Sequence, residues 1–494
     1  MTTASIPVQL KDASLFKTQA YVNGQWVGAA DGATFGVDNP ANGNTVAQVP
    51  NLSDAQVSQA IDDANAAWKP WRARSAKERA NILRRWFDLI NEHAEDLAQI
   101  LTLEQGKPIA EARGEITYGA SFVEWFAEQA KRVMGDLINA PITTNRIMVQ
   151  REPIGVCAAI TPWNFPNAMI TRKVAPALAA GCTVVLKPAA QTPLSALALA
   201  ELAERAGIPA GVFNVVTGDS QRSIGIGKVL CDSPVVRKLT FTGSTAVGRI
   251  LMQQSAPTIK KLSLELGGHA PFIVFDDADL DAAVDGAMIA KYRNAGQTCV
   301  CTNRIYVHES IYDTFVEKFS AKVAELKVGE GLTDKVTQGP LIDDAAVAKV
   351  REHVEDALAK GGKVAVGGEA HELGGRFYKP TVIANVDESM LCMREETFGP
   401  VAPVIKFTDE AKVLELANNT EYGLAAYFYS RDVNRIFRMS EGLEYGIVGV
   451  NTGLISSEVA PFGGVKQSGL GREGSVYGIE DFLEMKYVCI GGVQ

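Results

Sequence analysis

The stretch GVCAAITPWNFPNAMITRKVAPALAAGCTVVLKP, residues 155–188, decides the fold class. It contains an apolar run at 156–160, a polar loop with two prolines, a helical apolar pattern at 167–180 and a second apolar run at 183–186. Strand, helix and strand in this order predict a βαβ unit of a parallel sheet.

The alternation of strand and helix continues along the chain from this unit. We expect further strands at 212–216, 238–241 and 261–265, and helices at 193–206, 221–230 and 245–255. A second series of strands is expected at 271–275, 304–307, 363–366, 401–407, 425–429 and 446–450. Two doubly wound α/β sheets therefore form the predicted core.

The remaining segments carry other patterns. Residues 1–52 predict loops and short strands, and long amphipathic helical patterns follow at 60–68, 76–101 and 109–133. Residues 145–151 alternate like an extended strand, and the apolar tail 477–491 can pair with it. We expect a dinucleotide-binding domain (1–133 and 152–267), a catalytic domain (268–470) and a small β oligomerisation arm (134–151 and 471–494).

Composition limits the possible functions. The net charge of −9 argues against a general nucleic-acid binder, and the seven scattered cysteines indicate a reducing compartment. Neither a signal peptide nor a transit peptide is recognisable, and the longest uncharged stretch, 174–186, is too short to span a bilayer. We expect a cytoplasmic protein without a membrane partner.

Cys299 is the candidate nucleophile. It lies in Asn294-Ala295-Gly296-Gln297-Thr298-Cys299, a polar segment between an apolar-periodic run at 280–292 and a β-branched run at 304–307. This position predicts a turn between a helix and a strand, where a thiol can face a cleft. The alternative is a buried structural cysteine.

Two further residues supply what a nucleophilic thiol needs. Asn164, between Pro162 and Pro166, can direct its amide at a developing oxyanion. Glu265 ends an apolar strand, where unpaired burial would raise its pKa toward that of a general base. The alternatives are a turn asparagine that bonds its own backbone and a solvated or salt-bridged glutamate.

Other residues are candidates for binding. Lys187 and the Gly243-Ser244 turn end strands and can contact a ribose or a pyrophosphate at a helix N-terminus, and Glu396 can contact a ribose or remain solvated. Arg172 and Arg293, the latter within about 9 Å of Cys299 if that segment stays helical, can set substrate specificity together with Ser456. On a helix, an arginine can instead be a solvated surface residue.

Cys299 and Cys301 form a C-x-C pair. Metal binding is not expected there, because no histidine or further cysteine is near in the sequence. A reversible disulfide that silences the nucleophile is a hypothesis, and the alternative is that Cys301 is a small core residue.

Five stretches in order resemble the aldehyde dehydrogenase superfamily over essentially the whole chain: PWNFP (162–166), LELGG (264–268), GQTC (296–299), EETFGP (395–400) and PFGGVKQSG (461–469). The more local stretches ITRK (170–173), YRN (292–294), CVC (299–301) and ISS (455–457) are most similar to the succinate-semialdehyde dehydrogenases.

The resemblance implies a fold, a mechanism and a set of ligands. It implies a Rossmann-type cofactor domain, thiolate attack by Cys299, an oxyanion held by Asn164, hydride transfer to nicotinamide and thioester hydrolysis by water that Glu265 activates. The implied cofactor contacts are Trp163, Lys187, Ala190, Gly243, Ser244, Glu396 and Phe398. Arg172, Arg293 and Ser456 would bind the far carboxylate of a small anionic semialdehyde.

Several choices stay open at this stage. Ala190 stands where relatives that prefer NAD often carry a glutamate, so we expect NADP to be accepted and preferred over NAD. Glutarate semialdehyde is an alternative substrate, and a non-catalytic protein on this scaffold is an alternative of another class. The arm and tail favour a homodimer or a homotetramer.

Overall fold

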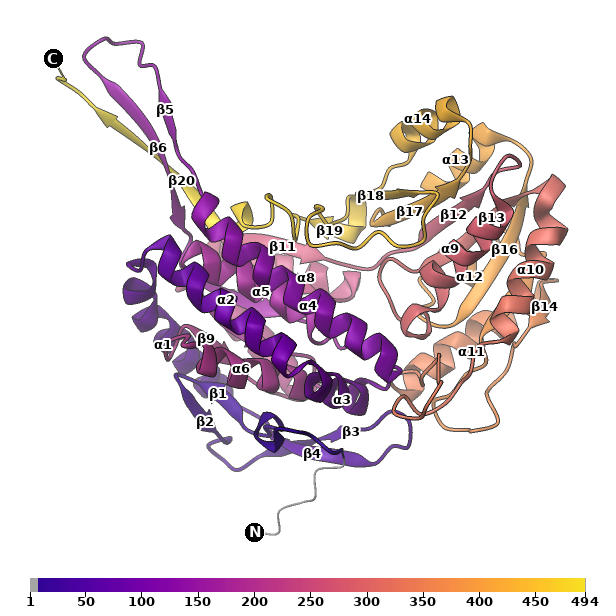
Figure 1. Cartoon of the computed structure of the whole chain (residues 1–494), viewed down its shortest axis with the longest axis horizontal. Helices are drawn as coiled ribbons and strands as arrows, with labels where there is room; N and C mark the ends of the chain where they lie inside the picture. Colours follow the sequence, from indigo (N-terminus) through magenta and orange to yellow (C-terminus); the bar gives the residue numbers. More distant parts are fainter. Residues whose placement is uncertain (1–7, 494) are drawn as a thin grey trace.

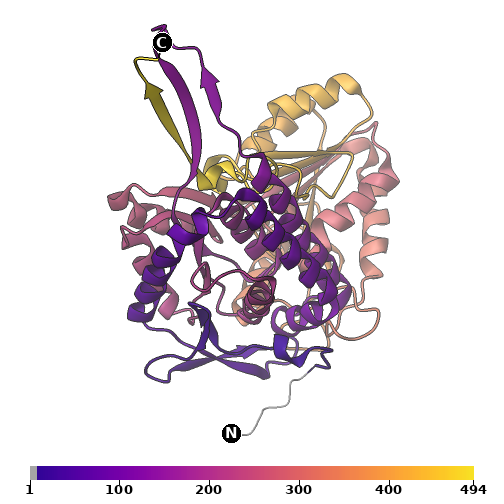
Figure 2. The same ribbon diagram turned by 60° about the vertical axis from the view of Figure 1, so that its left-hand side comes forward.

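The computed structural model describes residues 8–493. Two large sheets, each flanked by helices, form the body, and a narrow three-stranded sheet projects from it as an arm (Figure 1). A view turned by 60° shows the arm again projecting clear of the body (Figure 2).

The first sheet has the strand order β19-β11-β10-β7-β8-β9-β1-β2 within the described residues. Its central five strands are parallel, and β19, β1 and β2 are antiparallel to their neighbours. The bounds are β1 Ala20–Val22, β2 Gln25–Val27, β7 Val156–Ile160, β8 Thr183–Lys187, β9 Phe213–Val215, β10 Val236–Thr242, β11 Lys261–Glu265 and β19 Gly469–Leu470. The predicted strands of this sheet are confirmed.

Within residues 8–493, the second sheet has the strand order β14-β15-β16-β13-β12-β17-β18. Its bounds are β12 Ala270–Val274, β13 Thr302–His308, β14 Lys363–Val366, β15 Thr381–Ala384, β16 Val401–Phe407, β17 Ala425–Tyr429 and β18 Ile447–Val450. Strand β15 was not expected from the sequence; it forms through its pairing with β14 and β16. A separate hairpin joins β3 (Thr34–Asp38) to β4 (Thr45–Pro50).

The helices lie largely where the apolar periodicity places them. Their bounds are α1 Asp54–Arg72, α2 Ala76–Glu92, α3 Ala94–Gln105, α4 Ile109–Gln129, α5 Ala168–Ala180, α6 Leu194–Ala206, α7 Arg222–Asp232, α8 Thr245–Ser255, α9 Leu280–Tyr292, α10 Tyr312–Ala324, α11 Asp344–Ala359, α12 Leu391–Arg394, α13 Glu410–Asn418 and α14 Val433–Gly442. The single helical pattern expected at 76–101 is wrong. The chain leaves helical geometry at His93 (φ −103°, ψ 18°), which ends α2 and begins α3.

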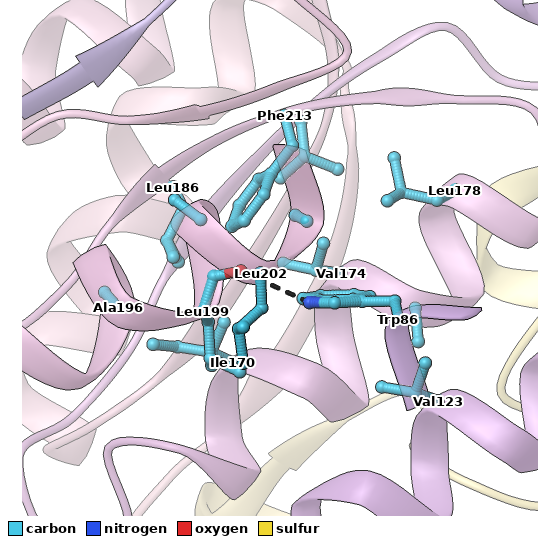
Figure 3. Close-up of a cluster of buried hydrophobic side chains, with 14 of the residues drawn as sticks. Trp86, Val123, Ile170, Val174, Leu178, Leu186, Ala196, Leu199, Leu202 and Phe213 are labelled. Carbon is cyan, nitrogen blue, oxygen red and sulfur yellow. Dashed lines mark hydrogen bonds between the residues drawn. The ribbon is translucent and has the colours of Figure 1, made fainter. Parts of the chain in front are cut away.

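The core of the first half of the chain packs α2, α4, α5 and α6 against the sheet. Trp86, Phe213, Val123 and Leu178 lie in this cluster, and the indole Nε1 of Trp86 donates to the carbonyl of Leu199 at 3.2 Å (Figure 3). The buried indole of Trp86 therefore keeps a hydrogen-bond partner while its ring fills the core, as is usual for a buried tryptophan.

The arm consists of β5 (Asp136–Ile138), β6 (Arg146–Pro153) and β20 (Leu483–Ile490). Strands β6 and β20 pair antiparallel from Arg146 opposite Ile490 to Pro153 opposite Leu483, which confirms the expected pairing of the tail with this segment. The arm exposes large apolar side chains, namely Met134, Leu137, Ile142, Met485 and Tyr487.

The connections of the first sheet create a crevice at its carboxyl edge. The chain passes from β7 to β8 and β9, then crosses to the other side of β7 to form β10 and β11. The loops after β7 and β10 therefore leave in opposite directions, and ligands of doubly wound sheets bind at such a switch point. The predicted boundaries of the domains stay predictions.

Candidate active site

The loop between β7 and α5 holds Asn164 in a fixed position. Its side-chain Nδ2 donates to the carbonyl of Gln297 at 3.0 Å, so one of the two amide hydrogens remains free for a ligand. Its backbone carbonyl accepts from Lys107 Nζ at 2.8 Å and from Asn294 Nδ2 at 2.9 Å. The alternative of an asparagine that bonds its own turn is wrong.

Cys299 lies on a turn between α9 and β13, as expected. Helix α9 ends at Tyr292, and Asn294 and Ala295 adopt left-handed geometry (φ 52° and 56°), so the segment from Arg293 to Cys299 is not helical and the distance expected from a helix does not apply. A Cβ on Gly268 would lie 2.1 Å from the carbonyl oxygen of Cys299, so glycine allows this turn to approach the end of the first sheet.

The thiol of Cys299 is protonated at neutral pH in this environment. Burial raises the pKa of Cys299 to about 12, and the Arg172 charge opposes this rise without cancelling it. A thiolate is the nucleophile, so attack needs a group that takes the proton.

Glu265 is a buried carboxylate at the end of β11. Its Oε2 has no hydrogen-bond partner in the protein, which contradicts the alternative of a solvated or salt-bridged side chain. Burial raises the pKa of Glu265 well above its ordinary value, and the nearby charge of Glu473 raises it further. A carboxylate in this state suits general-base chemistry.

Glu473 lies near Glu265 and pairs with two cations of helix α5. It forms ion pairs with Lys173 Nζ and with Arg172 Nε, and both cations come from α5. The contact with Arg172 is close, but it is not aligned as a hydrogen bond, and Arg172 Nη2 also lacks a partner. Arg172 is 1% exposed, so it is not a solvated helix residue.

A cavity of about 230 Å³ opens at the switch point. It brings together most of the residues singled out from the sequence: Trp163, Asn164, Arg172, Gly243, Ser244, Arg293, Cys299, Glu396, Phe398 and Ser456. Glu265 is not on its wall, although the next two residues, Leu266 and Gly267, are. Apolar walls with a few converging polar groups are typical of a small-molecule site.

Arg293 and Ser456 lie on the cavity wall with Arg172. The guanidinium of Arg293 stacks on the Phe165 ring at 4.7 Å, and that of Arg172 stacks on Phe462 at 4.1 Å. No carboxylate within residues 8–493 forms an ion pair with Arg293. Arg293 can therefore receive an anion, and Arg172, which is paired with Glu473 through Nε, keeps Nη2 without a partner.

The opposite part of the cavity has the features of a dinucleotide site. Ser244 caps α8 by accepting from the Val247 N–H, and a Cβ on Gly243 would lie 2.4 Å from the Phe241 ring. Glu396 Oε1 accepts from the Gly268 N–H at 3.0 Å, and burial raises the pKa of Glu396 to about 7, so it is not a solvated surface residue. Phe398 packs edge-on against Trp163, with ring centroids 5.5 Å apart.

Lys187 and Ala190 lie apart from this cavity. Lys187 is buried at the end of β8, and burial lowers its pKa to about 8. Ala190 lines a neighbouring cavity of about 290 Å³ together with Gln191, Asp219 and Ser220. A cofactor that contacts all the predicted residues would have to extend from the first cavity toward the second.

A sequence model described as the aldehyde dehydrogenase family matches residues 26–488. The chain belongs to the aldehyde dehydrogenase family.

Relatives agree on the enzyme class and differ in substrate. The chain is 63% identical over 486 residues to the glutarate-semialdehyde dehydrogenase of Pseudomonas aeruginosa, covering 98% of this chain and 100% of the relative. It is 62% identical over 484 residues to the succinate-semialdehyde dehydrogenase [NADP(+)] of Escherichia coli, with 98% and 100% coverage. A solved succinate-semialdehyde dehydrogenase from Burkholderia pseudomallei superimposes with a TM-score of 0.97 at 61% identity, covering 98% of this chain and 100% of that one. These matches confirm the expected fold and class.

Four residues of this aldehyde dehydrogenase site were missed or left unassigned from the sequence. Glu473 and Lys173 belong to the cluster around Glu265, and Tyr118 and Phe462 line the cavity. Tyr118 lies within an amphipathic helical pattern, where an aromatic residue indicates core, and nothing near Glu473 in the sequence indicates burial.

Cys301 follows Cys299 by two residues and is not among the residues that line the cavity. It is 1% exposed, and its sulfur lies 3.4 Å from the buried Lys291 Nζ. A disulfide between Cys299 and Cys301 stays a prediction. No helix in residues 8–493 is long and apolar enough to cross a membrane, and no cluster of three or more His, Cys, Asp or Glu suited to a metal occurs in that range.

Proposed function

We propose that this aldehyde dehydrogenase oxidises succinate semialdehyde to succinate. The observation that carries the proposal is the position of Arg172 and Arg293, whose guanidinium groups line the same cavity as Cys299 and Asn164. A carboxylate separated from the reacting aldehyde carbon by two methylene groups would place its charge between these cations, with Ser456 as a further donor.

The proposed reaction begins with proton transfer from Cys299 to Glu265. The raised pKa of Glu265 makes this carboxylate a proton acceptor for a thiol whose own pKa is about 12. The sulfur then adds to the aldehyde carbon. The free amide hydrogen of Asn164 and the Cys299 N–H would hold the oxyanion, and one such donor is worth about 2.7–4 kcal/mol of barrier.

Deacylation completes the reaction. A bound nicotinamide would supply the hydride acceptor, which leaves a thioester on Cys299. Glu265 first releases to solvent the proton that it took from Cys299. It then takes a proton from water as the water oxygen attacks the thioester carbon, and it returns this proton to the departing Cys299 sulfur, so that succinate and the thiol are released. The ion pair of Glu473 and Lys173 lies near Glu265, where Glu473 raises the pKa of Glu265 and Lys173 opposes that rise.

We also propose NADP as the preferred cofactor. Ala190 leaves no carboxylate at the position where a ribose diol would be bound, and Lys187 offers a cation to a 2′-phosphate. The name of the Escherichia coli relative, at 62% identity, supports this choice. The expected result is a higher kcat/KM with NADP than with NAD, and equal values would count against the preference.

The second candidate substrate is glutarate semialdehyde, which is one methylene longer. A relative at 63% identity carries this name. One methylene in a pocket is worth only about 1–3 kcal/mol, so a single enzyme can accept both lengths. A non-catalytic role on this scaffold is disfavoured because the thiol, the amide and the carboxylate are all present.

The deciding experiment compares succinate semialdehyde, glutarate semialdehyde and butyraldehyde at fixed NADP. If the charged contacts are worth about 3 kcal/mol, both acids gain about a hundredfold in kcat/KM over butyraldehyde. Equal rates for butyraldehyde would reject the anionic substrate. Activity that survives full alkylation of Cys299 by iodoacetamide would reject the mechanism.

We propose that the arm mediates assembly into a homodimer or homotetramer. Aldehyde dehydrogenases are generally oligomeric, and the apolar side chains of β5 and β20 are exposed in the single chain. Removal of such a patch from water favours association. Sedimentation of a Leu137→Asp variant tests this, with a monomer as the expected result.

A further inference from the structure

The hydroxyl of Tyr118 is buried beside the anion-binding cations without a partner of its own. Its oxygen has no hydrogen bond within the protein, although the residue lines the cavity with Arg172, Arg293 and Ser456. Buried hydroxyl groups nearly always have a partner, so an unpaired one at a cavity wall indicates a ligand.

The fold holds this tyrosine rigidly. Helix α4 packs closely on α5, because a Cβ on Gly119 would lie 2.1 Å from the Asn167 side chain. The Tyr118 ring contacts Phe122, one turn along α4, edge-on with centroids 5.0 Å apart. It also packs against the apolar cluster of Phe165, Ala168 and Met169. The hydroxyl is therefore positioned before any ligand arrives.

The charges around the hydroxyl suit a donor. Burial raises the pKa of Tyr118, while Arg172 and Arg293 act in the opposite direction, so both cations are near and the phenol stays protonated at neutral pH. Ser456 is the nearest potential hydrogen-bond partner of this hydroxyl, but the two side chains do not form a hydrogen bond of normal geometry. A protonated phenol between two cations can donate to an anion that the cations attract.

We propose that Tyr118 is a specificity-determining residue that donates a hydrogen bond to the substrate's terminal carboxylate. This inference rests on the proposed function and deepens it. The carboxylate then receives donors from helix α4, helix α5 and the loops that carry Arg293 and Ser456. A neutral aldehyde of the same length makes none of these contacts.

The test is Tyr118→Phe, which removes only the hydroxyl. A hydrogen bond to a charged group predicts a fall of about 10- to 100-fold in kcat/KM for succinate semialdehyde. The loss should be mainly in KM, because the contact is remote from the reacting carbon and is made before and during the reaction. The fall with butyraldehyde should be much smaller than the fall with succinate semialdehyde, and a normal thermal unfolding curve shows that the variant is folded.

A matched control is Tyr427→Phe. The Tyr427 hydroxyl is also buried near Cys299, but it already donates to the Val300 carbonyl at 2.9 Å. Loss of this hydroxyl should change kcat/KM for succinate semialdehyde and for butyraldehyde by the same factor. Inhibition by succinate against butyraldehyde gives a second readout, and its inhibition constant should rise at least tenfold in Tyr118→Phe only.

The outcomes separate this inference from the proposed function. If the wild-type enzyme shows no preference for semialdehydes over butyraldehyde, the proposed function is wrong. If the wild-type enzyme has this preference and Tyr118→Phe keeps it, only the proposed role of Tyr118 is wrong. The same holds if Tyr118→Phe lowers kcat/KM equally for both substrates.

Discussion

Two buried charge clusters lie on either side of the start of α5, and they differ in how completely they are paired. In the first, Lys107 Nζ bonds Glu115 at 2.6 Å and the Asn164 carbonyl, and Glu115 Oε1 accepts the N–H groups of Asn167 and Ala168. In the second, Glu265 Oε2, Glu473 Oε2 and Arg172 Nη2 have no hydrogen-bond partner.

The difference separates positioning from chemistry. A fully paired cluster stabilises one arrangement, and here it fixes the loop that carries Asn164. A cluster with unpaired oxygens and nitrogens costs free energy to bury, and such groups remain available to a substrate or a proton. The second cluster contains the proposed base and one of the proposed specificity residues.

The largest expected effect comes from the unpaired cluster. Glu265→Gln keeps the volume and removes the base, so kcat should fall by about 10²- to 10⁴-fold. Because Glu265 is proposed to accept the Cys299 proton as well, rapid mixing should show both the burst of cofactor reduction and the later thioester hydrolysis slowed.

Glu104→Gln is the control for this variant. Burial raises the pKa of Glu104 to about 8, but its carboxylate caps α6 through the N–H groups of Leu194 and Ser195. The Glu104→Gln variant should keep the kcat of the wild-type enzyme. Full activity in Glu265→Gln would place the base elsewhere.

The paired cluster predicts a loss of stability. Lys107→Met leaves Glu115 buried without its cation, and breaking a buried pair costs about 3–5 kcal/mol. The double variant Lys107→Met with Glu115→Gln should recover part of this loss, because glutamine still accepts the α5 N–H groups. Thermal unfolding of the three proteins tests this, and equal melting temperatures for the single and double variants would contradict it.

The smallest effect is a shift in pH dependence. Glu473 raises the pKa of Glu265, so Glu473→Gln should lower that pKa. A base works when ionised, so the rise of kcat with pH should move to lower pH in the variant. Movement to higher pH would mean that Glu473 supports the ionised form. Glu104→Gln should leave the profile in place.

Local sequence patterns were sufficient to predict most of the helices and strands of the fold. A capping box of Ser53 and Gln56 begins α1, and the strand at 261–265 and the helix at 245–255 have the predicted bounds. These elements carry their own period and caps. The break at His93 was not predicted because the apolar period continues across it. Strand β15 was not predicted because it is stabilised by its pairing with β14 and β16, which the local sequence does not show.

The candidate site was predictable where residues lie in loops at strand ends. Cys299, Asn164 and Gly243 stand out because polar or glycine residues interrupt apolar patterns. Tyr118 and Glu473 could not be found in this way. Their environment depends on helix packing at Gly119 and on the return of the C-terminal segment to α5, and neither is encoded within a few residues of them.

The packing of the C-terminal segment against α5 also predicts the order in which parts of the chain fold. Strand β19 completes the edge of the first sheet, Glu473 reaches α5, and β20 pairs with a strand more than 300 residues earlier in the sequence. Contacts this distant in sequence form late, because the entropy of closing the loop is lost before they form. In refolding experiments, far-UV circular dichroism should therefore recover before enzyme activity, since the last segment to dock is the one that completes the charge cluster around the base.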